Sequence, residues 1–231
     1  MDNGYLTSCA LAISTLITIM FALKKGVSNI ETNTFKKMLC VNILESLTTT
    51  MIVLNAATIN MMQLYKVLNR VDIILIISWC SLLLYYIFNV THKKSKNVKT
   101  VKYLIIFANF VFYILALLLD VQIIVQDNIL DSTGPLTFFG LGVAVVYIIL
   151  MVLVALVNYR KVDKDTKKKY LPLLFLILML IAVAILRIVK SEINLVSIIF
   201  CLVDMIMIFT IENPDIKMIE QLNIAREQAE N

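Results

Sequence analysis

Seven long runs of apolar residues, separated by short polar segments, dominate the sequence. A helix needs about 20 such residues to cross the hydrocarbon core of a bilayer, whereas strands of membrane barrels alternate over only about ten. Helices also satisfy their backbone hydrogen bonds within the segment, as lipid requires. The pattern therefore predicts seven membrane-spanning helices, at residues 5–23, 38–62, 71–91, 103–126, 136–158, 170–189 and 193–211.

Composition supports this assignment. Apolar residues make up 60% of the chain and charged residues 16%, against roughly 45–50% and 25% in soluble domains. A soluble protein of 231 residues could not bury so much apolar surface. The expected fold class is an all-α membrane protein, with a seven-transmembrane helix bundle over residues 1–211 and a cytoplasmic helix from residue 212 onward.

Lysine and arginine residues gather in alternate loops. Fifteen of the 21 lie between the first and second, third and fourth, and fifth and sixth predicted spans. Such residues are retained in the cytoplasm, so the N-terminus is expected outside and the C-terminus inside. The net charge of +5 then reflects orientation and contact with anionic lipid, and it calls for no nucleic-acid partner.

Two further features bear on the class of protein. Glycine (5) and proline (3) are scarce, while transporters commonly need helices interrupted near the middle of the membrane. Unbroken helices suit signal relay better.

The first span follows Met-Asp-Asn-Gly without a basic residue, which predicts a retained span instead of a cleaved signal peptide.

The polar segment after the last span is predicted to be a helix. Asn213 and Pro214 fit the N-cap and first position, and an acidic residue follows in the first turn. An apolar seam then recurs at intervals of 4, 3 and 4 residues, the rhythm of a two-stranded coiled coil: Met218, Leu222, Ala225 and Ala229. A solvated amphipathic tail is the alternative. The pattern runs to the last residue, which predicts that the natural protein continues.

The segment Thr210–Asn231, TIENPDIKMIEQLNIAREQAEN, resembles a known junction. In bacterial sensor histidine kinases with a seven-helix sensor, an ENPD-type turn joins the last membrane helix to a charged stem with IEQL-like steps. The turn here is Glu212–Asp215, followed by Ile219–Leu222 and by Ala225, Ala229 and Glu230. The resemblance covers about 22 residues. It implies a sensor in the bacterial plasma membrane, a parallel homodimer through this signalling helix, and a response regulator as partner.

The chemistry of a kinase is missing from this chain. The sequence holds no phosphoacceptor box and no ATP-binding motif, so ATP and Mg²⁺ are expected only in a kinase domain beyond it. The single histidine, His92, excludes paired haem ligands and the common zinc motifs. We expect no catalytic residue, cofactor or metal site here. A small transporter or channel, or a membrane scaffold without kinase output, remains as an alternative.

Ionisable residues inside the spans are candidates for sensing. Glu45 and Asp204 each lie about 10 Å from the cytoplasmic face at 1.5 Å per residue, which predicts one shared layer. Two close carboxylates would form a proton- or cation-sensitive site. The alternative is that each is neutral or hydrogen-bonded to neighbouring polar residues of the second span: Asn42, Ser46, Thr48 and Thr49. We also expect Asp204 to couple the sensor to the stem.

A second group of candidates lies nearer the outside. Asp120 and Arg187 are expected near the outer mouth, with Asp72 at the start of the third span. An Arg–Asp pair there would close a cavity or receive an anionic ligand. The alternative is that these side chains only extend to the membrane–water interface and have no binding role. Trp79 and Tyr147 lie near mid-membrane and either line a pocket or pack in the core.

Overall fold

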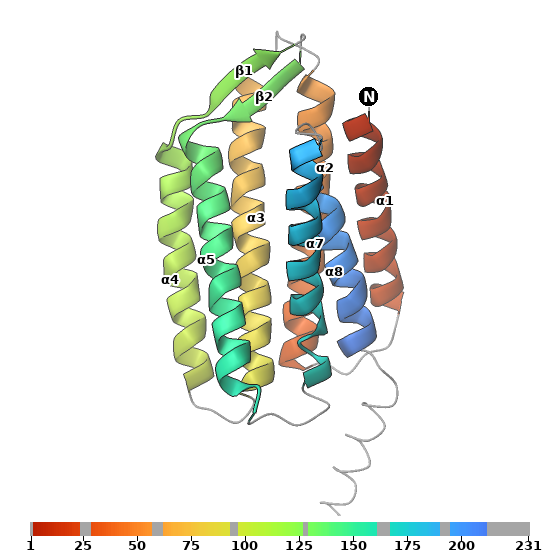
Figure 1. Cartoon of the computed structure of the whole chain (residues 1–231), viewed down its shortest axis with the longest axis vertical. Helices are drawn as coiled ribbons and strands as arrows, with labels where there is room; N and C mark the ends of the chain where they lie inside the picture. The colour runs from red at the N-terminus through yellow and green to blue at the C-terminus, as the bar shows by residue number, and fades with distance from the viewer. Residues whose placement is uncertain are drawn as a thin grey trace, which may run out of the picture.

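A computed structural model of the chain describes residues 2–23, 29–56, 62–92, 97–126, 129–160, 167–189 and 195–211. These residues form seven helices and two strands. The helices run side by side along the long axis of the molecule (Figure 1). They are α1 (Asp2–Leu23), α2 (Ile30–Ala56), α3 (Met62–Thr91), α4 (Asn97–Leu118), α5 (Pro135–Asn158), α7 (Leu171–Val189) and α8 (Val196–Ile211).

Five helices, α1 to α5, are long and apolar enough to cross a membrane within the described residues. The described apolar stretches of α7 and α8 are shorter. The prediction of a helical, multi-pass membrane protein is confirmed at this level. Two helices begin well before their predicted spans, α2 at Ile30 and α3 at Met62, because a membrane helix continues past the hydrocarbon layer.

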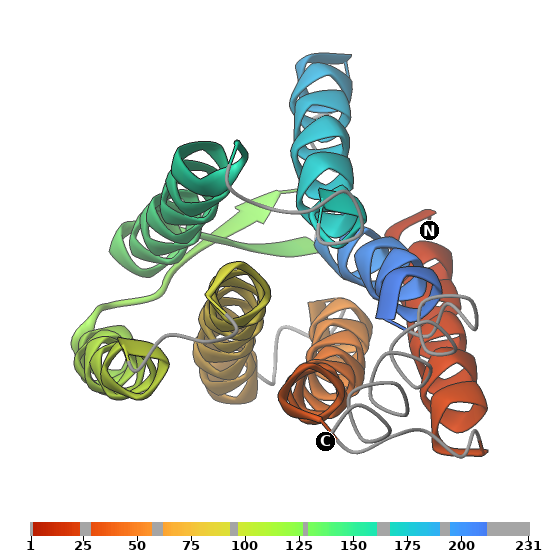
Figure 2. The ribbon, with the colours of Figure 1, turned by 90° about the horizontal axis from the view of Figure 1, so that it is seen from below.

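The helix α3 forms the centre of the bundle and packs against α2, α4 and α5 (Figure 2). On the other side, α8 packs against α1, α2 and α7. The α3 residues Ile77, Trp79, Leu83 and Ile87 are almost wholly buried. Phe200 of α8 stacks on Trp79, with ring centroids 3.9 Å apart. The core therefore extends from α3 to α8, which brings the two sides of the bundle together.

The segment after α4 folds as a short β-hairpin beside the otherwise helical bundle, which confirms the all-α class. Strands β1 (Gln122–Gln126) and β2 (Ile129–Thr133) pair antiparallel, and α4 ends at Leu118. The fourth span was thus predicted too long. A short apolar run such as Gln122–Gln126 does not distinguish helix from strand, and its β-branched residues favour a strand.

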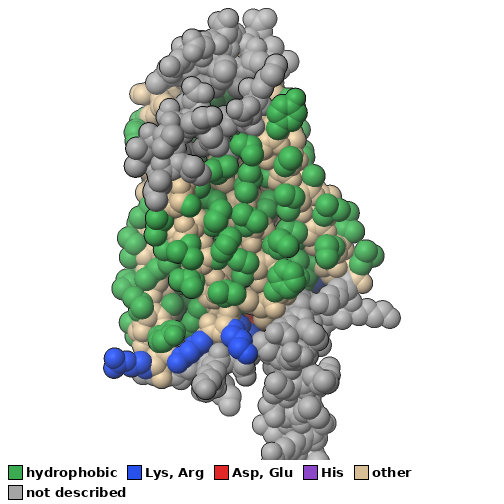
Figure 3. Space-filling view, turned by 45° about the vertical axis from the view of Figure 1, so that its right-hand side comes forward, with side chains coloured by type: hydrophobic (Ala, Val, Ile, Leu, Met, Phe, Trp, Pro, Cys, Tyr) green, Lys and Arg blue, Asp and Glu red, His purple; other side chains and the backbone are tan. Residues whose placement is uncertain are grey.

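The hairpin covers one end of the bundle. Val121 is buried together with Leu136 of α5, and Ile123 packs against this cluster and against Tyr65 of α3. Gly134 turns the chain into α5 with a φ of 96°, and a Cβ there would lie 2.9 Å from the Gln122 side chain. We call this the hairpin end. The opposite end is the lysine end, where α1, α3, α5 and α8 finish and α2, α4 and α7 begin; lysine and arginine side chains rim it in Figure 3.

Candidate functional site

Two buried hydrogen bonds attach α8 to α2. The Asn42 Nδ2 donates to Asp204 Oδ2 at 2.6 Å, and the Ser197 hydroxyl donates to Glu45 Oε1 at 2.8 Å. The side chains of Glu45 and Asp204 are 1% and 0% exposed. Burying a carboxyl group is costly unless donors reach it, so these bonds are part of what permits both groups inside the bundle.

A third carboxyl group joins the same site from α3. The Thr49 hydroxyl lies 3.0 Å from Asp72 Oδ1 and 3.3 Å from Glu45 Oε1. A hydroxyl carries one proton and so donates fully to only one of them at a time. The grouping of Asp72 with Asp120 and Arg187 was wrong, because α3 starts at Met62 and places Asp72 about 15 Å inside the helix.

These residues form one connected group. The Ser46 hydroxyl lies 3.4 Å from both Asn42 Oδ1 and Glu45 Oε2, and so bridges the two attachments to α8. We call the group the acidic cluster: Asn42, Glu45, Ser46, Thr49, Asp72, Ser197 and Asp204. The structure thus connects Glu45 and Asp204 through Asn42 and Ser46, without a direct contact between the two carboxyl groups among the hydrogen bonds of the described residues. Thr48 stays outside it and donates to its own helix at Leu44 O, 2.7 Å away.

Trp79 lies beside the acidic cluster. Its indole is fully buried and lies near the Asp204 carboxyl group, yet Trp79 Nε1 and Asp204 Oδ1 each lack a regular hydrogen bond among the described residues. Asn42 is therefore the direct donor that holds Asp204. Cys201, one turn earlier on α8, adds a contact to α1 through Ala10 O at 3.2 Å.

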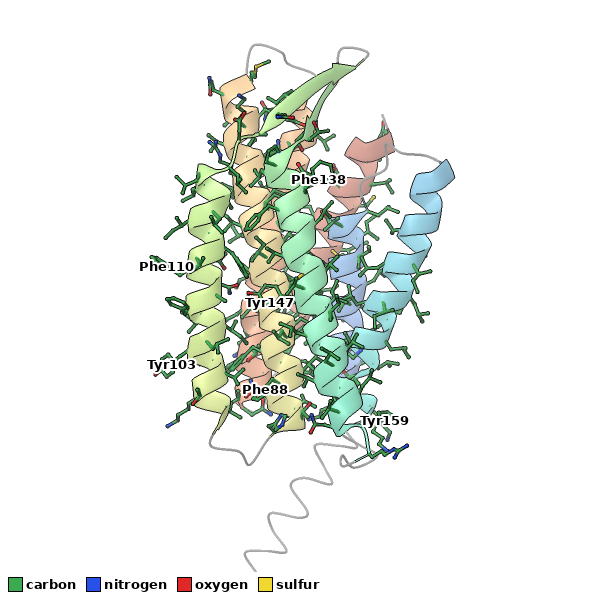
Figure 4. All side chains as sticks on the ribbon, turned by 60° about the vertical axis from the view of Figure 1, so that its left-hand side comes forward. Phe88, Tyr103, Phe110, Phe138, Tyr147 and Tyr159 are labelled. Carbon is green, nitrogen blue, oxygen red and sulfur yellow. The ribbon has the colours of Figure 1, made fainter. Side chains whose placement is uncertain are left out.

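Tyr147 belongs to a separate polar chain. Its hydroxyl donates to Asn109 Oδ1 at 2.5 Å, and Asn109 Nδ2 donates to Ser81 Oγ at 2.8 Å. The chain links α5, α4 and α3, and Tyr147 is 3% exposed (Figure 4). Tyr147 and Trp79 both pack in the core, in different polar surroundings.

The candidates near the hairpin end do not come together. Asp120 is exposed after the end of α4. Arg187 lies within α7, and its side chain is outside the described part. The helices α4 and α7 stand apart, on either side of α5, in Figures 1 and 2. The cation that does reach this region is Arg70, whose Nη2 donates to Leu119 O at 3.3 Å.

At the lysine end, sequence reasoning missed a buried ion pair. Lys169, just before α7, contacts Glu31 in the first turn of α2 at 2.5 Å, and their side chains are 9% and 8% exposed. Tyr86 of α3 is fully buried beside Glu31 and Thr210, the latter near the end of α8. The available signal was Glu31 itself, an acidic residue in a segment otherwise rich in lysine.

The predicted signalling helix lies outside the described residues, and this includes all six of its candidate positions: Asn213, Pro214, Met218, Leu222, Ala225 and Ala229. Within the described ranges, no three His, Cys, Asp or Glu side chains are placed to hold a metal ion. Comparisons of the chain with protein-family models, curated proteins and solved structures give no match.

Proposed function

We propose that this chain is the membrane input module of a bacterial sensor histidine kinase. Residues 1–211 would form a seven-span sensor in the plasma membrane, with the N-terminus outside. Residues from 212 onward would begin a dimeric cytoplasmic stem. The kinase domain, absent from this chain, would use ATP and Mg²⁺ and pass phosphate to a response regulator. The stimulus would be small or membrane-borne.

Several observations support the topology. The helices α7 and α8, of 19 and 16 residues, rise about 28 and 24 Å, close to the roughly 30 Å of a hydrocarbon core. Counting them gives seven spans. Lysine and arginine side chains rim the end of the bundle at which α8 finishes (Figure 3). The positive-inside rule then places that end in the cytoplasm.

The attachment of α8 to α2 carries the proposal. The helix that leads into the stem is held by buried hydrogen bonds at Asn42–Asp204 and Glu45–Ser197. A stimulus that disturbs the acidic cluster would change the free energy of these bonds and move α8 relative to α2. A signal is transmitted when it favours one of two arrangements of such an element.

A chimera tests the proposal. Residues 1–231 are fused in helical register to the catalytic half of a histidine kinase whose response regulator can be assayed in proteoliposomes. We expect Asp204→Asn and Asn42→Leu each to change phosphorylation by about fivefold or more, the lower range of allosteric coupling. Tyr113→Phe is the control, because its hydroxyl joins Ser78 of α3 to α4, away from α8. Output equal to that of the parent chimera in both variants would refute the proposal.

A small transporter or channel is the second candidate, and the acidic cluster favours it. Carboxyl groups within spans often mark ion pathways. Reconstituted vesicles under Na⁺, K⁺ and proton gradients separate the two: flux that Glu45→Gln abolishes would support transport, and silence under all three gradients would exclude these ions. If the chain is a scaffold without output, phosphorylation by the chimera should be the same in every acidic-cluster variant.

A further inference from the structure

A pocket of about 340 Å³ opens between α1 and α2 near the lysine end. Phe21 of α1 and Leu39 of α2 supply apolar walls, and Thr32 and Lys36 supply polar ones. None of these residues belongs to the acidic cluster. The pocket is thus a second concave feature on α2, and it combines an apolar wall with a cation.

The depth of the pocket matches the boundary between headgroups and acyl chains. Phe21 lies two residues before the end of α1, and Lys36 lies six residues, about 9 Å, after the start of α2. The 27 residues of α2 rise about 40 Å, the thickness of a bilayer with its headgroups. The headgroup layer on each side is then about 5 Å deep, so the Lys36 backbone lies about 4 Å inside the hydrocarbon boundary, within reach of the headgroups for a long lysine side chain.

The polar wall offers two donors. The Thr32 hydroxyl is buried and has no hydrogen-bond partner among the described residues, while its backbone N–H is already bound to Asn29 Oδ1 at 2.7 Å. Lys36, one turn further along α2, is exposed and carries an ammonium group. A hydroxyl and an ammonium group one helical turn apart suit the oxygens of a phosphate.

An apolar stripe continues from the pocket along α2. It begins at Cys40 and contains Leu44, Leu47 and Met51, which are 51%, 38% and 44% exposed. Intervals of 4, 4, 3 and 4 residues from Lys36 keep these side chains on one helix face. From Cys40 to Met51 the rise is about 16 Å, half of a hydrocarbon core. The middle of α2 falls near Leu44, so this face is charged near the lysine end, and Cys40 and Leu44 are the part of the stripe that lies in the adjoining leaflet.

We propose that this pocket binds the phosphate headgroup of an anionic phospholipid, whose acyl chain lies along the first part of the stripe, at Cys40 and Leu44. Basic pockets between spans hold acidic headgroups in this way. Lys36 pairs with the phosphate, Thr32 donates a hydrogen bond to it, and Phe21 and Leu39 contact the glycerol region. The site does not depend on the kinase proposal, since it requires only a chain embedded in a membrane.

Native mass spectrometry of the 231-residue chain, reconstituted in mixed phosphatidylglycerol and phosphatidylcholine, tests the site. We expect preferential retention of phosphatidylglycerol. Lys36→Gln should lower its apparent affinity about tenfold, the effect of losing one charge-assisted hydrogen bond. Lys37→Gln is the matched control, because it removes the same charge from the neighbouring exposed position, which does not line the pocket. Thr32→Val should weaken retention less than Lys36→Gln.

Helicity and thermal unfolding in pure phosphatidylcholine confirm that each variant is folded; Lys36 and Lys37 are both exposed, so neither substitution should disturb packing. Equal losses in Lys36→Gln and Lys37→Gln would reduce the effect to general surface charge and overturn the site. Equal retention of both lipids would also overturn it. If soluble glycerol phosphate displaces the lipid at comparable concentration, the site binds a free phosphate ester and the lipid assignment fails.

Discussion

Two buried glutamates on α2 occupy opposite kinds of environment. Glu31, at the lysine end, is paired with Lys169. Glu45, four turns further along, contacts the hydroxyls of Ser197 and Thr49 and lies near a second carboxyl group, Asp72. A loop in the aqueous phase can supply a lysine to the end of a bundle at little cost. In the membrane interior the described partners of the carboxyl groups are hydroxyls and one amide. The acidic cluster is therefore stabilised by hydrogen bonds, whereas the lysine end is stabilised by an ion pair.

The largest expected effect comes from breaking the ion pair. Lys169→Met removes the ammonium group that pairs with the buried Glu31 carboxylate, and we expect the free energy of unfolding in mixed micelles to fall by about 3 kcal/mol, the lower range for such a loss. Lys102→Met, at an exposed position of α4, should change it by about 0.5 kcal/mol or less. The double variant Glu31→Gln/Lys169→Met should regain most of the loss. Equal effects of the two lysine variants would show that the pair contributes nothing.

A smaller effect is expected inside the bundle. Asn42→Leu keeps the volume but removes the donor to Asp204, and an unsatisfied buried acceptor costs about 2 kcal/mol. Asn55→Leu, on the same helix, is the control: Asn55 is half-buried, and its side chain bonds to Met51 O of its own helix among the described contacts. Unfolding of both variants in the same micelles measures the difference. A loss no greater than that of Asn55→Leu would mean that Asn42 does not support Asp204.

The smallest effect should follow the exchange that most closely contrasts the two glutamates. Glu45→Gln retains an oxygen that can accept from Ser197 and Thr49 and places an amide donor toward the Ser46 hydroxyl, so we expect a change of about 1 kcal/mol or less. Glu31→Gln removes the carboxylate that pairs with the Lys169 ammonium group, and it should lower the free energy of unfolding by more. Parallel unfolding measurements on both variants decide the point; a ranking in the opposite order would reject this account of the two environments.

Depth along the membrane was predictable from the sequence. Counting residues from the ends of the spans placed Glu45 and Asp204 in one layer, and in the structure both belong to the acidic cluster, with Glu45 about one turn along α2 from the Asn42 that bonds to Asp204. The same counting misplaced Asp72, because the start of α3 lies in a segment of mixed polarity that hydropathy assigned to a loop.

Which helices face each other was not predictable. The spans are apolar on all sides, so the sequence gives no direction for Trp79 or Tyr147, and the stack of Trp79 on Phe200 follows from packing between distant segments. The hairpin was missed for a related reason: residues 122–126 are apolar enough to extend a span, and only pairing with residues 129–133 makes them a strand. The ion pair likewise joins residues 138 positions apart.

The two bonds between α2 and α8 lie at different depths, and this geometry limits how α8 can move. Ser197 and Asp204 are seven residues apart, about 10 Å along the axis. A slide of α8 by one residue, 1.5 Å perpendicular to these bonds, lengthens them only to about 3.0 and 3.2 Å, whereas a slide by one turn, about 5.4 Å, breaks both together. A small shift of α8 is therefore compatible with both bonds. Under the proposed function, only a shift close to a full turn would change the attachment, and the response at the end of α8 would be stepwise instead of graded.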